Sequence, residues 1–302
     1  MKTKVFLFAA LAAATVSMTS CNSDDETIDN TPVEIRLSST NEASLTTRST
    51  DQAIQLTQFK NNEKIKVFIN EDGEAQTALP LEYTANGGGV MTPPALQFFP
   101  QSGNGVNIHA FYPLTATDDL VTPKTFAIAT DQSTDAAYKA SDLMYGVPAS
   151  NPVARTSSEI QLTFEHLLSK VNIELKVGNG SPTLVGSTVK LKGIKPETTF
   201  DPLDGSITAA AGTATDITVM ATNNVSLAGS VIIIPQTLSG AFIEVTLPSG
   251  GVLTYTLPAA TEFEGKKQYD YEITVNLTGL TVKSEISPWG NGGNSTGTAV
   301  MN

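Results

Sequence analysis

The sequence predicts an all-β protein built from antiparallel β-sandwiches. Short segments rich in Val, Ile, Thr, Tyr and Phe recur along the chain, and many alternate apolar with polar residues. Turn-forming sequences separate several of them: Asp72-Gly73, "NGGG" at 86–89 and "PSGG" at 248–251. One short stretch, "EHLLSK" at 165–170, has a helical pattern. Closely spaced strands joined by Gly- and Pro-containing turns are typical of β-sandwiches.

Two segments show what kinds of strand to expect. In "KVNIELKV" (170–177) apolar and polar residues alternate, which predicts a strand with one face on a core. "VIIIP" (231–235) does not alternate, which predicts a strand covered on both faces and ended by Pro235. The segments expected to form strands are 33–39, 64–70, 79–85, 106–112, 170–177, 188–194, 231–235, 241–247, 252–257 and 269–277.

The first 20 residues have the order of a secretory signal peptide: two lysines, an apolar run over 5–16, then small residues. The run is shorter than the roughly 20 residues that cross a bilayer. Ser20-Cys21 resembles the end of a bacterial lipobox, in which the cysteine is acylated, although Met18 stands where leucine is usual. An ordinary signal peptide is the alternative. A single cysteine cannot form an internal disulfide, so lipidation explains it better.

An acidic stretch, "NSDDE", follows Cys21 directly. It is similar to an export signal that sends some lipoproteins to the outer face of the outer membrane, and it also has the composition of a disordered tether. We therefore expect a signal peptide at 1–20, an acidic lipoprotein tether at 21–31, and a location at the cell surface.

Composition bounds the rest of the molecule. The net charge of −12 and the 18 scattered basic residues argue against nucleic-acid binding. The length after the tether favours two domains, an N-terminal β-sandwich at 32–165 and a C-terminal one at 166–302. The loop at 178–182 is an alternative boundary, and a single domain is also compatible with this length.

No catalytic or metal-binding motif is evident. His109 lies in a predicted strand, where a packed histidine is expected. His166 is interpreted as a turn residue bonded to backbone, with pairing to Ser169 as the alternative. "NEDGE" (70–74) resembles part of a calcium loop but lacks its closing glutamate, so a hairpin turn is expected. We expect no enzyme activity, no cofactor and no metal.

Several segments together carry a family resemblance: "HAFYPL" (109–114), "SDLMYG" (141–146), "LTFEHLLSKVNIEL" (162–175), "VIIIPQTL" (231–238) and "YDYEITVNLTGLTVKSEISPW" (269–289). In this order they resemble the signature blocks of the fimbrillin family, the pilin-like lipoproteins of type V pili. The resemblance implies two transthyretin-like β-sandwich domains in tandem, export as a lipoprotein, and assembly into a surface fibre.

The resemblance also implies processing by an arginine-specific protease that removes the lipid and the first strand. Arg48 lies in a small polar stretch after the predicted first strand, so the Arg48–Ser49 bond is the expected cleavage site, within a first strand and cleavage loop at 32–50. Arg36 lies inside that strand and should be protected. Arg155 comes too late in the chain to free a first strand. An uncut, solvated loop arginine is the alternative.

In this family a strand of another subunit then fills the vacated groove, which is β-strand addition. The C-terminal tail at 290–302 has a glycine-rich start and then "STGTAVMN". Thr298, Ala299, Val300 and Met301 are therefore the candidate donor strand. The alternative is a packed or frayed end in a tip or anchor subunit. Trp289, just before the tail, is expected in the core rather than as a glycan platform.

The expected partners are other pilin subunits, the outer membrane through the lipid, and a surface receptor. Two rival functions remain. A glycan-binding lipoprotein would need an exposed aromatic platform, and a β-sandwich hydrolase would need converging carboxylates or a nucleophile beside a base. An uncleaved surface lipoprotein, either a pilus anchor or a glycan-binding protein, is the main alternative.

Overall fold

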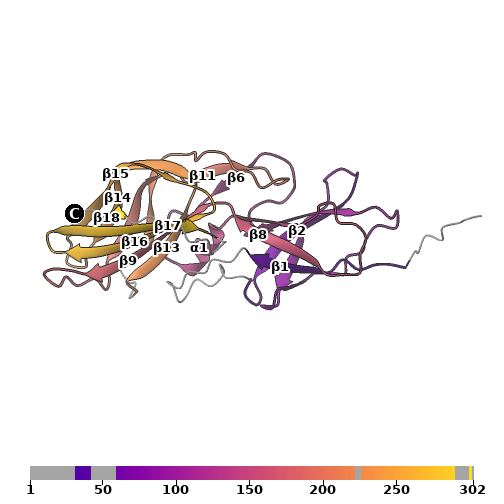
Figure 1. Cartoon of the computed structure of the whole chain (residues 1–302), viewed down its shortest axis with the longest axis horizontal. Helices are drawn as coiled ribbons and strands as arrows, with labels where there is room; N and C mark the ends of the chain where they lie inside the picture. Colours follow the sequence, from indigo (N-terminus) through magenta and orange to yellow (C-terminus); the bar gives the residue numbers. More distant parts are fainter. Residues whose placement is uncertain (1–30, 42–58, 222–225, 290–298, 301–302) are drawn as a thin grey trace, which may run out of the picture. The chain divides into compact units, whose positions relative to one another are not determined.

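The structure, a computed structural model, describes residues 31–41, 59–221, 226–289 and 299–300 (Figure 1). It is all-β apart from one short helix, as predicted. Its elements are β1 (Leu37–Asn41), β2 (Lys64–Glu71), β3 (Leu81–Ala85), β4 (Val90–Thr92), β5 (Val106–Tyr112), β6 (Lys124–Ala127), α1 (Asp135–Ala140), β7 (Met144–Pro148), β8 (Ile160–His166), β9 (Ser169–Val177), β10 (Thr188–Ile194), β11 (Glu197–Phe200), β12 (Thr215–Met220), β13 (Ala228–Ile233), β14 (Gln236–Thr246), β15 (Val252–Phe263), β16 (Lys267–Asn276), β17 (Gly279–Pro288) and β18 (Ala299–Val300).

The first half of the described chain forms a closed barrel with the strand order β1-β4-β3-β2-β5-β7-β8. Apolar side chains from all of these strands fill its interior as one buried cluster. Most neighbours are antiparallel, but β1 runs parallel to β8 and so closes the barrel. The expectation of purely antiparallel sheets is therefore wrong for this pair. Because β1 and β8 are far apart in the chain, no tight turn joins them and forces them to run antiparallel.

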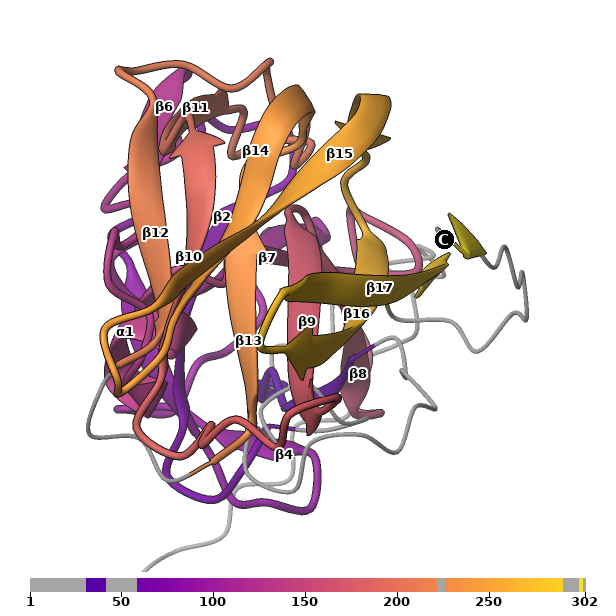
Figure 2. The ribbon, with the colours of Figure 1, turned by 90° about the vertical axis from the view of Figure 1, so that its left-hand side faces the viewer.

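The second half contains a four-stranded sheet, β12-β10-β14-β15, and a five-stranded sheet, β13-β9-β16-β17-β18 (Figure 2). The second sheet also contains a parallel pair, β9 with β16. Inner side chains of both sheets form one buried cluster, which is the core of a sandwich. The alternation predicted for 170–177 is confirmed as far as Leu175, and Val231 to Ile234 are fully buried, as predicted.

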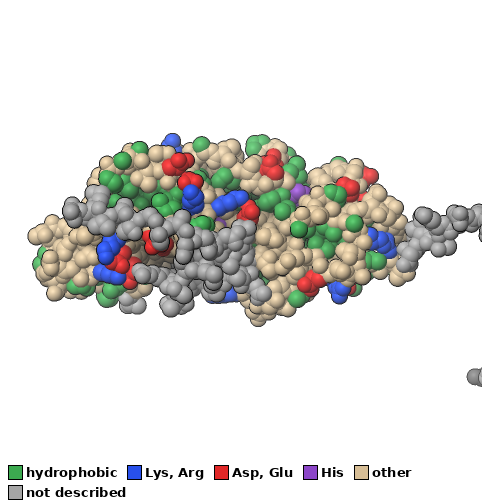
Figure 3. Space-filling view, viewed as in Figure 1, with side chains coloured by type: hydrophobic (Ala, Val, Ile, Leu, Met, Phe, Trp, Pro, Cys, Tyr) green, Lys and Arg blue, Asp and Glu red, His purple; other side chains and the backbone are tan. Residues whose placement is uncertain are grey.

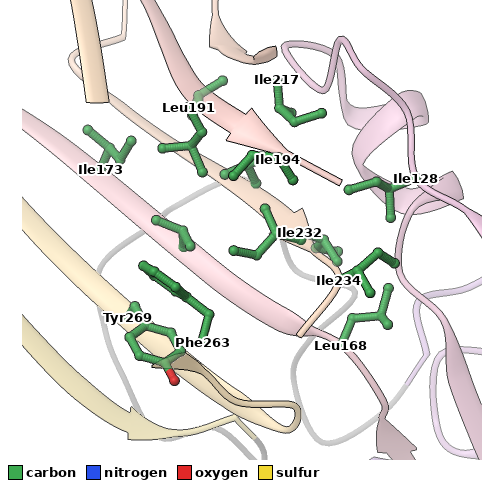
Figure 4. Close-up of a cluster of buried hydrophobic side chains, with 14 of the residues drawn as sticks. Ile128, Leu168, Ile173, Leu191, Ile194, Ile217, Ile232, Ile234, Phe263 and Tyr269 are labelled. Carbon is green, nitrogen blue, oxygen red and sulfur yellow. The ribbon is translucent and has the colours of Figure 1, made fainter. Parts of the chain in front are cut away.

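The connection between β5 and β7 packs into this second core. Phe126 and Ile128 belong to the same buried cluster as the sandwich strands, and Figure 4 shows Ile128 beside Ile234 and Leu168. Strand β6, within the connection, pairs with β11 along its full length. Residues on both sides of position 165 therefore share one core. The division into an N-terminal domain at 32–165 and a C-terminal domain at 166–302 stays a prediction.

The helix predicted over 165–170 is wrong. Strand β8 ends at His166 and β9 begins at Ser169, so only two residues separate them. The helix lies instead at α1, where the Thr134 hydroxyl accepts a hydrogen bond from the Ala137 amide and Lys139 pairs with Asp135 one turn away. A helix of six residues is too short to show a helical period of apolar residues, so periodicity could not predict α1.

Several strands were not predicted, namely β4, β6, β7, β8, β11, β12 and β17. In the part of the chain that the structure describes, no helical segment could span a lipid bilayer. On the face drawn in Figure 3, acidic and basic side chains lie beside one another rather than in patches of one sign.

Candidate strand-addition groove

Residues 33–41, which lie in the first described part of the chain, are hydrogen-bonded along both edges. Their neighbours are the stretch 97–99 and β4 on one side and β8 on the other. Two amides of the segment donate hydrogen bonds outward, that of Ile35 to Gln97 O (2.8 Å) and that of Ser39 to Gly89 O (2.7 Å). Two of its carbonyls accept, that of Val33 from the Phe99 amide (2.9 Å) and that of Arg36 from the Ile160 amide (2.8 Å).

Alternate side chains of this segment point into the barrel. Ile35, Leu37 and Ser39 are each 1% exposed, whereas Arg36 is exposed and Ser38 is half-buried. In the parallel register, Leu37 lies opposite Ile160 and Ser39 opposite Leu162, both of which are buried. We call the space that residues 33–41 occupy between 97–99, β4 and β8 the groove.

Phe164 marks the end of the groove at which β1 finishes. It lies opposite Asn41 of β1 and opposite Gly146 of β7. A Cβ atom on Gly146 would lie 2.6 Å from the Phe164 ring, so only glycine leaves room for that ring. The Phe59 ring meets it edge-on at 4.9 Å between centroids. A lone glycine in the pattern "LMYGVP" was the available signal for this close approach, and the prediction missed it.

The root of the C-terminal tail lies beside the end of β8. Trp289 is 2% exposed and its ring stacks on the His166 ring, so the expectation that it packs in the core is confirmed. His166 is not a turn residue bonded to backbone: it is the last residue of β8, and its Nδ1 lies 2.8 Å from a carboxylate oxygen of Asp142. Neither the contact nor Asp142 was predicted, because 24 positions separate the two residues.

Part of the candidate donor strand forms β18, where Ala299 pairs with Ser284 and Val300 with Lys283 of β17. Thr298 and Met301 lie outside the described residues, as do Cys21, Arg48 and Ser49. Of the other two arginines, Arg36 has its carbonyl in the ladder with β8, and the half-buried Arg155 reaches Pro100 O at 3.5 Å.

His109 is packed in β5, as expected. Its Nδ1 lies 2.9 Å from the Tyr145 hydroxyl, which donates to Leu203 O at 2.8 Å. Burial lowers the pKa of His109, against an opposing effect of the Asp201 carboxylate. The same surroundings, chiefly burial, raise the pKa of Tyr145 above its usual range. Both groups are therefore neutral at pH 7, and they join the barrel to the loop that carries Leu203.

The "NEDGE" segment forms a turn, as predicted. Gly73 has a φ of 84°, and the Asn70 side chain accepts a hydrogen bond from the Ala78 amide. Asp118 and Asp119, adjacent in the sequence, pair with different lysines, Lys66 and Lys124. No group of three or more His, Cys, Asp or Glu side chains among the described residues could hold a metal ion.

Comparison with known proteins assigns the chain to a family. A model of the family described as Fimbrillin-like matches residues 47–289. The chain belongs to the fimbrillin-like family. This fimbrillin-like chain is 27% identical over 322 residues to a Bacteroides uniformis protein provisionally named fimbrium subunit Fim1C, and the match covers 99% of the chain and 100% of that protein.

Two solved structures share the fold of this fimbrillin-like chain. One is a protein of Bacteroides uniformis provisionally described as a cell adhesion protein, with a TM-score of 0.63, 22% identity, and coverage of 85% of this chain and 98% of that one. The other is a protein of Bacteroides ovatus with the same provisional description, with a TM-score of 0.62, 19% identity, and coverage of 86% and 98%. At these identities the likeness establishes the fold alone.

Proposed function

We propose that this chain is a structural and adhesive pilus subunit of the cell surface, assembled by proteolysis and strand exchange. It is exported as a lipoprotein precursor anchored through Cys21 to the outer membrane. An arginine-specific protease cuts the Arg48–Ser49 bond. The first segment then leaves the groove, and an extended strand of another pilin subunit takes its place. Membership of the fimbrillin-like family supports this proposal.

The observation that carries the proposal is the double-sided pairing of residues 33–41. If this segment leaves, β8 and β4 become open edges with unpaired backbone N–H and C=O groups, which is the state that accepts an added strand. The loss of Ile35 and Leu37 also empties two apolar sites, each worth about 2–5 kcal/mol in a packed core. An opened barrel therefore has a strong tendency to bind a replacement.

The position of the cleavage site supports the order of events. The backbone of Arg36 is hydrogen-bonded to β8. A protease active site therefore cannot bind the backbone around Arg36 while this strand stays in place. Arg48 follows β1 by seven residues, so a cut there would separate the whole first segment, with Cys21, from the rest of the chain. A cut at Arg155 would leave that segment covalently attached to most of the barrel.

The main alternative is an uncleaved surface lipoprotein, either a pilus anchor or a glycan-binding protein. For the glycan-binding version, Trp289 is unsuitable as a platform because its ring is buried. Among the large exposed apolar side chains of the described residues, Phe98 is the one aromatic. In the anchor version Arg48 stays uncut, so residues 33–41 keep their place in the groove and no strand is exchanged there.

The test is limited digestion of residues 22–302 with an arginine-specific protease, read by intact mass and by a gel run without boiling. We expect one cut, after Arg48, followed by heat-sensitive oligomers when other subunits are supplied. Arg48→Lys keeps the charge but is not a substrate, so it should stay intact and monomeric. An intact wild-type chain would favour the uncleaved anchor, and first cuts at Arg36 or Arg155 would overturn the proposed order.

A further inference from the structure

We infer that the groove takes a strand from a different protein subunit, with two large apolar side chains two residues apart, and not residues 298–301 of a second copy of this chain. This inference rests on the proposed function and specifies the partner. Residues 33–41 now fill the groove, so the groove's requirements can be read from the side chains that they place in it.

The groove has two fully buried large apolar positions followed by a small one, and the half-buried Val33 packs against the same cluster at its start. Ile35 and Leu37 are two residues apart and are both buried in the barrel cluster. Ser39, two residues after Leu37, is equally buried. Its backbone amide donates a hydrogen bond to Gly89 O, and it lies opposite Leu162 in the register with β8. Because a strand places alternate residues on one face, any replacement must match this spacing. The pattern required is large apolar, any residue, large apolar, any residue, small.

The segment 298–301 does not provide this pattern. In one register it would place Thr298 and Val300 at the two large positions, and in the other Ala299 and Met301. If the strand ran in the opposite direction, the two residues of each pair would swap sites, but the same two residues would still fill them. Either way, one of the two sites receives threonine or alanine instead of a large aliphatic side chain. An underfilled buried site loses both the apolar transfer free energy and the packing contacts.

The same segment already has a position within its own chain. Ala299 and Val300 form β18 on the edge of β17, with Ala299 opposite Ser284 and Val300 opposite Lys283. Residues on an outer sheet edge need no large apolar side chains, since the edge supplies backbone pairing and not a deep pocket. Two observations therefore agree: the groove requires side chains that 298–301 lack, and these residues are suited to an edge.

The experiment is a peptide-exchange measurement on the full chain after cleavage at Arg48. Labelled peptides compete for the groove, and bound peptide is measured by native mass spectrometry. The peptides are residues 31–41, residues 294–302, and residues 294–302 with Ala299→Ile. The substituted peptide places Ile and Met two residues apart. Val300→Ile is the matched control. It adds apolar volume to the tail, but Thr298 still occupies the other large apolar site in the register that places residue 300 in the groove.

We expect residues 31–41 and the Ala299→Ile peptide to exchange into the groove, and the unmodified tail and the Val300→Ile peptide to bind about 30-fold more weakly or worse. Equal binding of residues 31–41 and the unmodified tail would overturn the inference while leaving strand exchange intact. If labelled 31–41 itself does not exchange, the proposed function fails, and the inference fails with it.

Discussion

The indole ring of Trp289 lies nearly parallel to the imidazole ring of His166, with 4.0 Å between ring centroids and 12° between ring planes. The contact joins the last residue of β8 to the residue that follows β17, and the Trp289 amide also donates to Lys266 O at 2.6 Å. The end of the barrel and the root of the C-terminal tail are thus held at one point, in a buried environment.

Replacing His166 should destabilise the protein through two lost interactions. His166→Ala removes the ring stack on Trp289 and one hydrogen-bond partner of the buried Asp142 carboxylate. We expect the free energy of unfolding to fall by about 3 kcal/mol. His166→Phe keeps a ring for stacking and should lose less than the alanine variant. Urea unfolding measures both, and equal stability of His166→Ala and wild type would show that this contact contributes nothing.

Gly146→Ala should also be destabilising, although alanine is usually the better strand residue. The new Cβ would approach the Phe164 ring to 2.6 Å and push it away from its place beside Phe59. Overpacking of this kind costs about 1–3 kcal/mol. Gly279→Ala is the matched control, since a Cβ there meets nothing within 4 Å. Thermal unfolding of the two variants should separate clearly, and identical melting temperatures would contradict the account.

Gln132 replaces a missing strand partner for β13. Its side-chain oxygen accepts from the Ile232 amide at 2.8 Å, and its Nε2 donates to the Ile232 carbonyl at 2.8 Å. Gln132→Leu removes both partners while keeping most of the volume, and should cost about 2–4 kcal/mol in unfolding free energy because two buried backbone groups are left unpaired. Gln161→Leu, at an exposed position, should change little. A similar effect of both substitutions on stability would rule out this role.

Lys170 makes the stability depend on pH. The residue is 8% exposed, so its side-chain ammonium group is largely removed from water. Burial lowers the pKa of this lysine from 10.5 to about 8, although Asp142 and Asp270 act in the opposite direction. The unfolded chain therefore binds more protons than the folded one between these values, so stability should rise as pH increases from 8 to 10.5.

Lys170→Met tests this directly. The difference in pKa corresponds to about 3 kcal/mol at pH 7, which the variant should gain, and its stability should no longer rise with pH through this range. Lys60→Met, at an exposed site, should leave both the stability at pH 7 and the pH profile close to those of wild type. A Lys170→Met variant less stable than wild type at pH 7 would show that the buried charge is compensated in a way the described contacts do not include.

The local pattern of apolar and polar residues was enough to predict many of the strands. Alternation identified β2, β5, β9, β10 and β16, and the uninterrupted apolar run identified a strand buried on both faces. The inward side chains of the candidate groove, Ile35, Leu37 and Ser39, also follow from the alternation in "VEIRLSS". These features depend on neighbouring residues alone, because side chains on a strand alternate with a fixed period of two.

Which strands become neighbours depends on the fold as a whole. Local sequence patterns predict an all-β chain, a first strand followed by a loop with Arg48, and no recognisable catalytic motif. Only the fold showed that this strand runs parallel to β8, that the β5–β7 connection packs in the sandwich core, and that Trp289 stacks on His166. The physical reason is that strand direction and partner choice arise from contacts between residues more than 100 positions apart, as between β1 and β8, and such contacts leave no mark on local periodicity.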